Sequence, residues 1–356
     1  MKINDIAKLA NVSKSAVSLA LNGKNGVSEK TRQKVLQIAK ENGYVPRPIV
    51  RADEISGQNT KAFRFIACTN EGIVTEQYES LPFFMELINS LDRHTDAAGY
   101  SLMVSSVKAE NLFEEINRLE DEQKSAGILL LGTNLTAEQI KLVANIHPNL
   151  VVLDTCYGML DVNFVVMNNM HGAYKAGEYL IEQGHTRIGY CSSESRMYNF
   201  DMRKKGFFTA MDEHQISVAD EHIFVMSPTL IQSTPEFQTQ IQELKENLPT
   251  ALFCECDYMA ISVIKSLTEL GLRVPHDISV IGFDNILESQ VITPELTTIH
   301  VKKDRIALLA VEKLLREINQ FETDKLKIFV DTELIERKSC QPFNQEVIEN
   351  NPKLVL

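Results

Sequence analysis

The side chains of Lys14, Ser15 and Ser18 lie on one side of a short predicted helix near the N-terminus. Ser13 is placed to cap this helix, because its hydroxyl can accept a hydrogen bond from the free amides of the first turn. The first turn of a helix that enters the major groove reaches the base edges, where lysine and serine form hydrogen bonds. These residue types therefore predict base contacts from Lys14 and Ser15, with Ser18 and Leu19 beside them.

Two more short helices are predicted around this one. The first begins at Asn4 and is separated from the second by about three residues, which is the spacing of a helix-turn-helix. The second ends at Asn22, another candidate for a DNA contact, and the third begins after Ser28. Lys30 and Arg32, near the amino end of the third helix, suit contacts to phosphates. Structural adaptors also contain three-helix heads, so helical periodicity alone leaves DNA binding open.

Charge is divided unevenly along the chain. The 356 residues carry a net charge of −12, which by itself argues against a nucleic-acid partner. Residues 1–51, however, contain ten Lys and Arg against three Asp and Glu, a net charge of +7, and the remainder carries −19. This asymmetry is expected of a small DNA-binding head on an acidic regulatory body, although a solvated helix face also gathers charge.

Beyond residue 62 the sequence alternates short apolar runs with amphipathic stretches. Continuous apolar strands linked by helices predict parallel sheets that are covered on both faces. In such sheets ligands bind at the carboxyl ends of the strands, and two sheets would leave a cleft between them. The expected strands span residues 63–68, 101–105, 127–131, 150–154, 187–191, 251–255 and 278–283, and the expected helices include 83–98, 170–183 and 258–270.

Composition and motifs argue against several classes of protein. No run approaches the ~18 apolar residues of a membrane helix and no apolar signal region is seen, so a cytoplasmic protein is expected. The six cysteines are expected to be reduced, and the eight histidines lack metal spacing, so neither a metal nor a cofactor is expected. Motifs such as H-E-x-x-H, G-x-S-x-G and the P-loop are missing, so an enzyme is not expected.

Three runs near the N-terminus carry a family resemblance: INDIAKLANVSKSAVSLALNGK, GVSEKTRQKVL and ENGYVP. They are similar, nearly position for position, to the head of the lactose-repressor (LacI/GalR) family. The resemblance continues to about residue 340, through stretches such as LIEQGHTRI, VPHDISVIGFD and PELTTI. It implies a sequence-specific DNA-binding transcriptional regulator, expected to be a repressor.

The resemblance also implies a domain plan. An N-terminal all-α helix-turn-helix head is expected to be followed by an α/β periplasmic-binding-protein-like (type I) module of two parallel-sheet subdomains. The chain is expected to cross between the subdomains three times. The expected parts are the head at 1–45, a hinge or linker at 46–61, the effector-binding and dimerisation domain at 62–340, its subdomains at about 62–160 with 288–321 and 161–287 with 322–340, and a C-terminal tail at 341–356.

Effector-binding residues are also carried over from the family. Arg203 matches the family's effector-binding arginine, and Asp257 and Asp284 match acids at the ends of two strands. Asp154 and Thr69, which follow other expected strands, are second choices. Forked donors and carboxylates suit paired sugar hydroxyls. The alternative is that Arg203 and either acid form only a salt bridge within a subdomain.

The sequence departs from the family pattern in the head and hinge. Leu19 stands where the family has a base-reading arginine, so it is expected to prefer a thymine methyl group. Asp53 stands where a leucine wedges into the minor groove. Either Ile55 supplies the wedge in a shifted helix, or the head binds without the usual kink. A polar segment of this kind is also consistent with a plain flexible linker.

The expected cleft departs from the pattern as well. Cys256 replaces an asparagine, and the family's V-D-N has become Asn168-Asn169. The chain has no tryptophan, so other aromatic rings must stack on the apolar face of a sugar. The candidates for stacking are Phe83, Tyr157, Tyr198 and Phe283, each of which is also a common core or rim residue.

The expected partners are operator DNA, a small effector that is a sugar or sugar phosphate, and a second copy of the chain, with a tetramer also open. Effector binding is expected to change operator affinity, either releasing the DNA or strengthening the complex. One alternative is control by a phosphoprotein corepressor. Another is a sugar-binding protein or a sugar-acting enzyme, in which Asp257 and Asp284 form an acid–base pair.

Overall fold

The chain divides into two compact units, Met1–Asn59 and Thr60–Leu356. The computed structural model describes residues 7, 9–10, 12–13, 16–17, 20, 28–41, 61–70, 73–245, 247–320 and 324–343. The division lies close to the expected end of the hinge at residue 61.

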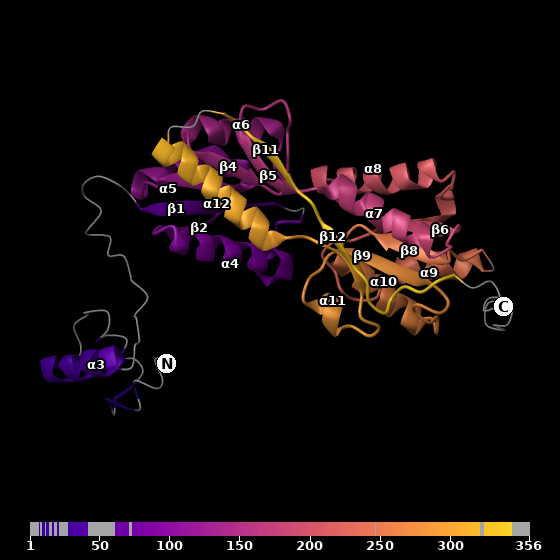
Figure 1. Ribbon diagram of the computed structural model, residues 1–356, viewed down its shortest axis with the longest axis horizontal. Helices are drawn as coiled ribbons and strands as arrows, with labels where there is room; N and C mark the ends of the chain where they lie inside the picture. The colour runs from indigo at the N-terminus through magenta and orange to yellow at the C-terminus, as the bar shows by residue number, and fades with distance from the viewer. Residues whose placement is uncertain are drawn as a thin grey trace. The chain divides into compact units, whose positions relative to one another are not determined.

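The first unit has a small apolar core. Ala10 and Val17 are buried with Val35 of helix α3 (Glu29–Glu41), which Figure 1 labels. Two serines cap helices as their positions predict. The Ser13 hydroxyl accepts from the amide of Ala16 (3.1 Å), and the Ser28 hydroxyl accepts from the amide of Thr31 (3.2 Å). A core this small depends on such caps, since each contributes about 1 kcal/mol.

The predicted DNA-contacting residues are only partly covered by the structure. Lys30 is exposed on the first turn of α3, and Arg32, two residues further along, is half-buried. The remaining candidates lie outside the described residues: Lys14, Ser15, Ser18, Leu19, Asn22 and Ile55.

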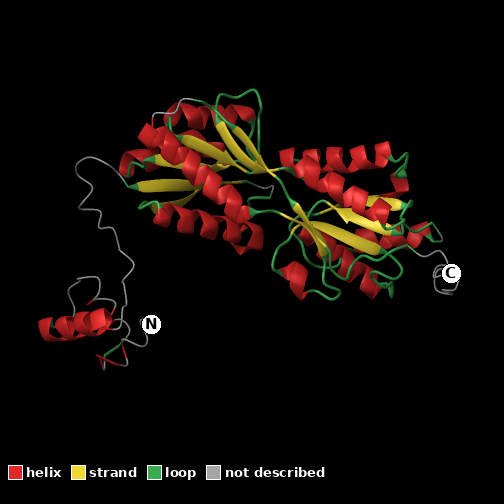
Figure 2. Ribbon diagram, in the orientation of Figure 1, coloured by secondary structure: helices red, strands yellow, loops and turns green. Residues whose placement is uncertain are grey.

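In the second unit the described residues form two six-stranded sheets, which Figure 2 shows in two separate lobes. The first sheet has the strand order β11-β5-β4-β3-β1-β2 and the second the order β12-β10-β9-β8-β6-β7. The first contains β1 (Ala62–Thr69), β2 (Ser101–Lys108), β3 (Gly127–Leu131), β4 (Leu150–Leu153), β5 (Asn163–Met167) and β11 (Lys327–Val330). The second contains β6 (Ile188–Ser193), β7 (Ile223–Met226), β8 (Ala251–Cys254), β9 (Ser279–Asp284), β10 (Thr297–His300) and β12 (Glu333–Ile335).

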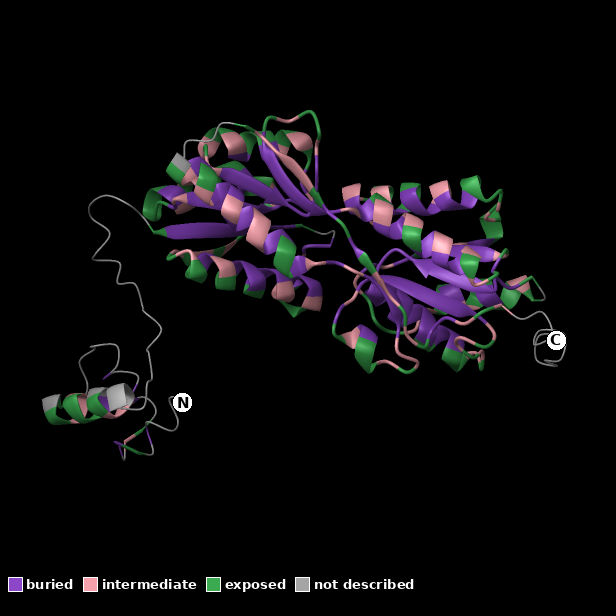
Figure 3. Ribbon diagram, in the orientation of Figure 1, coloured by how far each residue is buried: buried purple, intermediate pink, exposed green. Residues whose placement is uncertain are grey.

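Helices cover both faces of each sheet, so the central strands are buried throughout, as Figure 3 shows in purple. The helices around the first sheet are α4 (Pro82–Ala97), α5 (Leu112–Glu122), α6 (Ala137–Ile146) and α12 (Lys303–Gln320). Those around the second are α7 (Asn169–Glu182), α8 (Tyr198–Glu213), α9 (Pro235–Leu244), α10 (Asp257–Glu269) and the short α11 (Glu288–Val291). Single 3-10 turns lie at Tyr78–Ser80, Ala109–Asn111 and Asp220–His222.

The expected fold is confirmed, with one exception to the parallel order. Pairs such as β1 with β3 and β6 with β8 are parallel. The final strand β12, in contrast, runs antiparallel to β10, with Thr298 opposite Ile335. Strand β12 needs no helical crossover, because it enters the second sheet directly from β11.

The chain crosses between the subdomains three times, but each crossing comes one strand later than predicted. β5 belongs to the first sheet and not to the 161–287 part, β10 belongs to the second and not to 288–321, and β11 belongs to the first and not to 322–340. The reason is strand pairing. Val152 aligns with Phe164, for example, so the chain completes a buried strand before it leaves the sheet. The crossings therefore fall near Asn168, before α12, and between β11 and β12.

None of the helices in the described part of the chain combines the length and apolar character needed to span a lipid bilayer. The six cysteines are all free and buried. The described residues also bring together no group of three His, Cys, Asp or Glu side chains fit to hold a metal ion.

Candidate functional site

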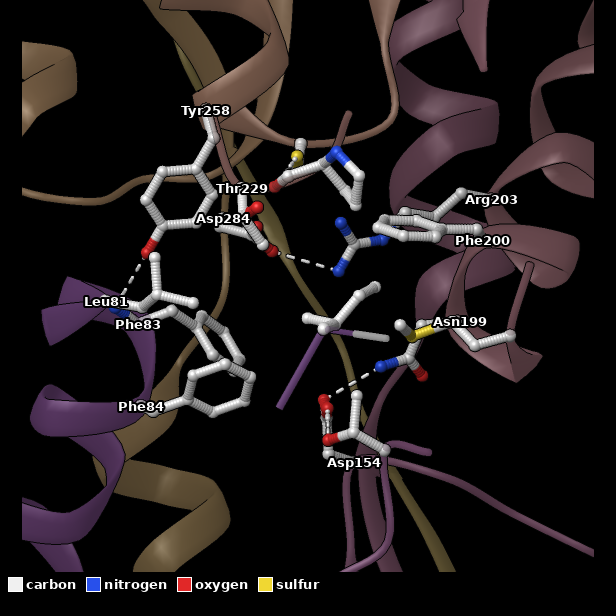
Figure 4. A pocket seen from close by; sticks show the side chains of 15 residues that line it. Leu81, Phe83, Phe84, Asp154, Asn199, Phe200, Arg203, Thr229, Tyr258 and Asp284 are labelled. Atoms are coloured by element: carbon white, nitrogen blue, oxygen red, sulfur yellow. Dashed lines mark hydrogen bonds and ion pairs between the residues drawn. The ribbon is translucent and has the colours of Figure 1, made fainter. Parts of the chain in front are cut away.

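A pocket lies between the two subdomains of the second unit, and Figure 4 shows it from close by. It contains about 430 Å³ of empty space. Its residues come from the carboxyl ends of strands and from the helices that follow them, as expected for ligand sites in such sheets. They are Ile73, Leu81, Phe83, Phe84, Thr133 and Asp154 from the first subdomain, and Met197, Asn199, Phe200, Arg203, Pro228, Thr229, Cys256, Tyr258 and Asp284 from the second.

Arg203 is the cation of the pocket and is held on several sides. It lies on α8 and is 3% exposed. Its Nη2 donates to the carboxylate of Asp284 at 2.9 Å, and its Nη1 donates to the backbone carbonyl of Glu255. The guanidinium also lies 3.8 Å from the centre of the Phe283 ring. These contacts fix the plane of the guanidinium at the pocket wall.

Asp284 and Asp154 are the two carboxylates of the pocket. Asp284 is the last residue of β9 and Asp154 directly follows β4, and both have a positive φ, 118° at Asp284 and 63° at Asp154. Burial raises the pKa of Asp284, and the neighbouring Arg203 partly opposes this. Burial also raises the pKa of Asp154 to about 6, although the hydroxyl of Thr133 donates to it at 2.5 Å. Both carboxylates therefore occupy an environment in which a hydrogen-bond donor is favoured and an added anion is not.

Three side chains connect the two subdomains across the cleft. The Asn199 amide donates to the Asp154 carboxylate at 2.8 Å, and the Tyr258 hydroxyl accepts from the backbone amide of Phe83 at 3.2 Å. Figure 4 marks both contacts with dashed lines. Buried Lys303, at one crossing, donates to the Asp284 carbonyl (3.1 Å) and contacts Glu86 of α4 (2.9 Å). The cleft is therefore closed around the pocket.

Aromatic rings stand on both walls of the pocket. Phe83 and Phe84 come from the start of α4 and pack edge to face, with 5.4 Å between their centres. Phe200 lies opposite on α8, with the Arg203 guanidinium 5.5 Å from its ring centre. Flat or partly apolar ligands suit such a site, since rings on two sides exclude water from it.

Four of the six predicted effector residues line the pocket: Arg203, Asp284, Asp154 and Phe83. Asp257 does not. Its two carboxylate oxygens accept from the backbone amide of Ile286 (2.9 Å) and from the hydroxyl of Thr298 (2.5 Å), so it braces the second sheet. Thr69 does not line the pocket either, because its hydroxyl donates to the backbone carbonyl of Val107 within the first sheet.

The other predicted stacking residues also have different roles. Phe283 is fully buried beneath Arg203, and the Tyr157 hydroxyl donates to the carbonyl of Leu135 at 2.8 Å. Tyr198 packs against the core of the first subdomain. The sequence reasoning missed Thr133, Asn199, Phe84, Phe200 and Tyr258. Their only signal was that each follows a strand or opens a helix at the cleft edge.

Two family models match the chain. The model for bacterial regulatory proteins of the lacI family matches residues 2–47, and that for a periplasmic binding protein-like domain matches residues 178–340. Among curated proteins, the HTH-type transcriptional repressor PurR of Pasteurella multocida is 32% identical, with 95% of this chain and 98% of the relative covered. The PurR repressor of Proteus mirabilis is 33% identical, with 95% of this chain and 96% of the relative covered.

Solved structures share the fold at lower identity. The lac repressor dimer bound to operator and the anti-inducer ONPF has a TM-score of 0.69 at 23% identity, covering 96% of this chain and 99% of its own. The regulator CelR in complex with cellobiose has a TM-score of 0.67 at 22% identity, covering 95% and 99%. A regulator from Enterococcus faecium with bound ribose has a TM-score of 0.66 at 21% identity, covering 80% and 100%.

Proposed function

Since this chain belongs to the LacI family of bacterial regulatory proteins, we propose that a small neutral ligand of the sugar class binds in its cleft and changes the affinity of its head for operator DNA. The chain is a DNA-binding transcriptional repressor, as its relatives are, and not an enzyme. The observation that carries the ligand proposal is the convergence of Arg203, Asp284 and Asp154 with aromatic rings from both subdomains.

The chemistry of the pocket favours a neutral ligand over a phosphorylated one. Among the residues that line the pocket, Arg203 is the sole Lys or Arg, and Asp284 already neutralises it. A phosphate would add negative charge beside Asp154 and Asp284, two carboxylates in a buried setting. Sugar hydroxyls would instead donate to these carboxylates, while the C–H faces of the ring pack on Phe83 and Phe200. The free sugar, and not its phosphate, is the preferred class.

Solved neighbours support this choice of class. One neighbour is bound to cellobiose and another to ribose. Their folds match that of the present chain, so a cleft of this architecture accepts sugars of different sizes. Specific recognition here depends on the side chains of this chain, and Asn199 and Thr133 are the polar groups that discriminate among hydroxyl patterns.

Closure of the cleft couples the ligand to DNA. A ligand that contacts both subdomains binds the closed form more tightly than the open form, and it shifts the population by that difference in affinity. The operator affinity of the head then changes by the same coupling free energy, typically about 1–3 kcal/mol. The sign of this change decides between an inducer and a corepressor.

A homodimer completes the proposal, because a two-fold protein matches two operator half-sites. Strands β2 and β7 each lie at one end of their sheet, opposite β11 and β12. Each exposes an apolar side chain, Val104 at 48% and Val225 at 60%, and Ile231 beyond β7 is 41% exposed. In the proposed dimer a second copy of the chain covers these edges.

A thermal-shift experiment with free sugars and the corresponding sugar phosphates tests the ligand class. A free sugar is expected to raise the melting temperature, and its phosphate is expected to have little effect. Arg203→Lys keeps the charge beside Asp284 but loses the forked donors, so it should lose most of the shift. The matched control is Arg93→Lys, which changes an exposed ion pair with Asp304. A shift that occurs only with phosphates would reject the neutral class.

Gel shifts on the upstream DNA of the gene test the head. Lys14→Ala is expected to reduce discrimination between operator and mutated operator, since Lys14 and Ser15 are proposed to contact bases. Lys30→Ala and Arg32→Ala are expected to weaken binding to all sequences alike and to lower its salt dependence, since these residues are proposed to contact phosphates. Equal binding of wild-type protein to operator and scrambled DNA would reject sequence-specific repression.

A further inference from the structure

A chain of hydrogen bonds runs from Arg203 to the opposite subdomain. Arg203 Nε donates to Asn169 Oδ1 at 2.9 Å, and Asn169 Nδ2 donates to Asn199 Oδ1 at 2.9 Å. Asn199 Nδ2 then donates across the cleft to Asp154 Oδ1 at 2.8 Å. The hydroxyl of Thr133 occupies the other oxygen of Asp154 at 2.5 Å. Two side-chain amides therefore stand in series between a guanidinium and a carboxylate.

The chemistry of the two ends fixes the direction of every bond in this chain. A guanidinium only donates, so the Asn169 atom that faces it must be the oxygen. The Asn169 nitrogen then faces Asn199, which must present its own oxygen and turn its nitrogen toward Asp154. An ionised carboxylate only accepts, so this arrangement satisfies all four groups. Reversing either amide would place two acceptors or two donors together.

Asn169 lies outside the pocket. It is the first residue of α7, next to a crossing between the subdomains, and it is 2% exposed. It does not line the pocket, whereas Asn199 and Asp154 do. A buried polar side chain that bonds to partners on both sides acts through those partners.

We infer that Asn169 is a positioning residue: because it accepts from Arg203, it donates to the oxygen of Asn199, and the nitrogen of Asn199 is thereby turned across the cleft toward Asp154. An effector hydroxyl that donates to Asp154 competes with Asn199 for this carboxylate. The orientation of the Asn169 and Asn199 amides thus sets the strength of the hydrogen bond from Asn199 to Asp154, which is the bond that the effector replaces. This last step rests on the proposed function, because it assumes that the cleft is the effector site.

The test exchanges the amide of Asn169 and the acid of Asp154, the two groups that flank Asn199 in this series of hydrogen bonds. In Asn169→Asp, the new carboxylate accepts from Arg203 and draws the Asn199 nitrogen toward itself. The Asn199 oxygen then faces the oxygen of Asp154, and the cross-cleft bond is lost. Adding Asp154→Asn supplies an amide nitrogen that donates to Asn199, so the double variant restores the bond with reversed polarity. Asp154→Asn alone keeps the original direction, because the Thr133 hydroxyl can accept as well as donate.

Amide hydrogen exchange of residues 197–203 at pH 8, without DNA or effector, is the readout. At this pH Asp154 is ionised, since its pKa is about 6. Exchange in Asn169→Asp is expected to be faster than in the wild type on the order of tenfold. The double variant is expected to return to within about threefold of the wild type. The matched control is Asn149→Asp, which removes a donor to the Ala126 carbonyl within one subdomain and should leave residues 197–203 unchanged.

Rescue by the second substitution is the decisive outcome. If Asn169→Asp fails to fold, the inference requires that the double variant recover folding, as judged by circular dichroism. The inference would be overturned if the double variant exchanged at residues 197–203 as fast as Asn169→Asp, or failed to fold as that variant does. Unchanged exchange in Asn169→Asp would overturn it as well. If no sugar in the thermal-shift panel raises the melting temperature, that result counts against the proposed effector. The hydrogen-exchange experiment does not depend on it, because it is done without effector.

Discussion

The hydroxyl of Tyr258 accepts the backbone amide of Phe83 at 3.2 Å, and this contact joins the start of α10 in one subdomain to the start of α4 in the other. Helix α4 has no side-chain cap of its own at Leu81. The first turn of a helix carries free amides that need acceptors, and Tyr258 supplies one from across the cleft. This one contact therefore both stabilises the start of α4 and closes the pocket.

Tyr258→Phe is expected to lower the free energy of unfolding by about 1 kcal/mol, since it leaves the amide of Phe83 without this acceptor. The exchange rate of the Phe83 amide should rise, and urea denaturation with hydrogen exchange checks both effects. The matched control is Tyr157→Phe, because the hydroxyl of Tyr157 bonds to the Leu135 carbonyl within one subdomain. If the exchange rate of the Phe83 amide rose equally in Tyr258→Phe and Tyr157→Phe, the Tyr258 hydroxyl would not be the group that protects this amide.

Helices α7 and α8 pack closely enough that Gly206 admits no side chain. A Cβ at this position would overlap the backbone carbonyl of Met170. Gly206→Ala is therefore expected to cost about 1–3 kcal/mol or more in the free energy of unfolding, because the helices must move apart. The same movement separates Asn169 on α7 from Arg203 on α8, so sugar-induced stabilisation should fall as well.

Urea denaturation of Gly206→Ala checks this prediction. Gly158→Ala is the matched control, since a Cβ there would have nothing within 4 Å. A surface change of this kind is expected to stay within about 0.5 kcal/mol of the wild type. Equal stability of the two variants would contradict the close approach of α7 and α8.

Asp257 makes stability depend on pH between its ordinary pKa of 3.8 and about 8. Burial raises the pKa of Asp257 to about 8 from its ordinary value of 3.8. Between these two pKa values the folded protein keeps a proton that the unfolded chain has released, so stability falls as the pH rises toward 8 and levels off above it. Asp257→Asn retains the bond from the Ile286 amide and can donate to the Thr298 hydroxyl, so this loss should disappear. Thermal melts between pH 6.5 and 8.5 compare the two slopes, and parallel slopes would reject a proton on Asp257.

Much of the fold was predictable from sequence because its signal is repetitive. The apolar runs at β3 and β8 are continuous, and those at β1 and β9 are nearly so, which is the mark of a strand buried on both faces. The crossings were placed wrongly, since the assignment of a strand to one sheet or the other depends on long-range pairing. Nothing within β5 or β10 distinguishes the two sheets.

The site was predictable only where the residue type limits the options. Arg203 and Asp284 carry charges that need a partner when buried, and the family pattern pointed to both. Asp257 also follows a strand of the second sheet, as the first residue of α10, yet its carboxylate turns toward Ile286 and Thr298. Sequence does not show which way a strand-end carboxylate faces. Asn199 and Asn169 were missed as site residues for a related reason, because a neutral amide gains its role only from the groups at its two ends.

The apolar edge of β7 provides the last prediction. Val225 is 60% exposed on this end strand, so Val225→Glu leaves the fold of a single chain nearly unchanged. At the proposed dimer contact, however, an unpaired buried charge costs about 3–5 kcal/mol. We expect a shift from dimer to monomer in sedimentation at micromolar concentration, together with weaker binding to a two-half-site operator. Met159→Glu, at a residue 99% exposed between β4 and β5, is the control and should remain dimeric. A dimeric Val225→Glu protein would exclude this edge from the interface.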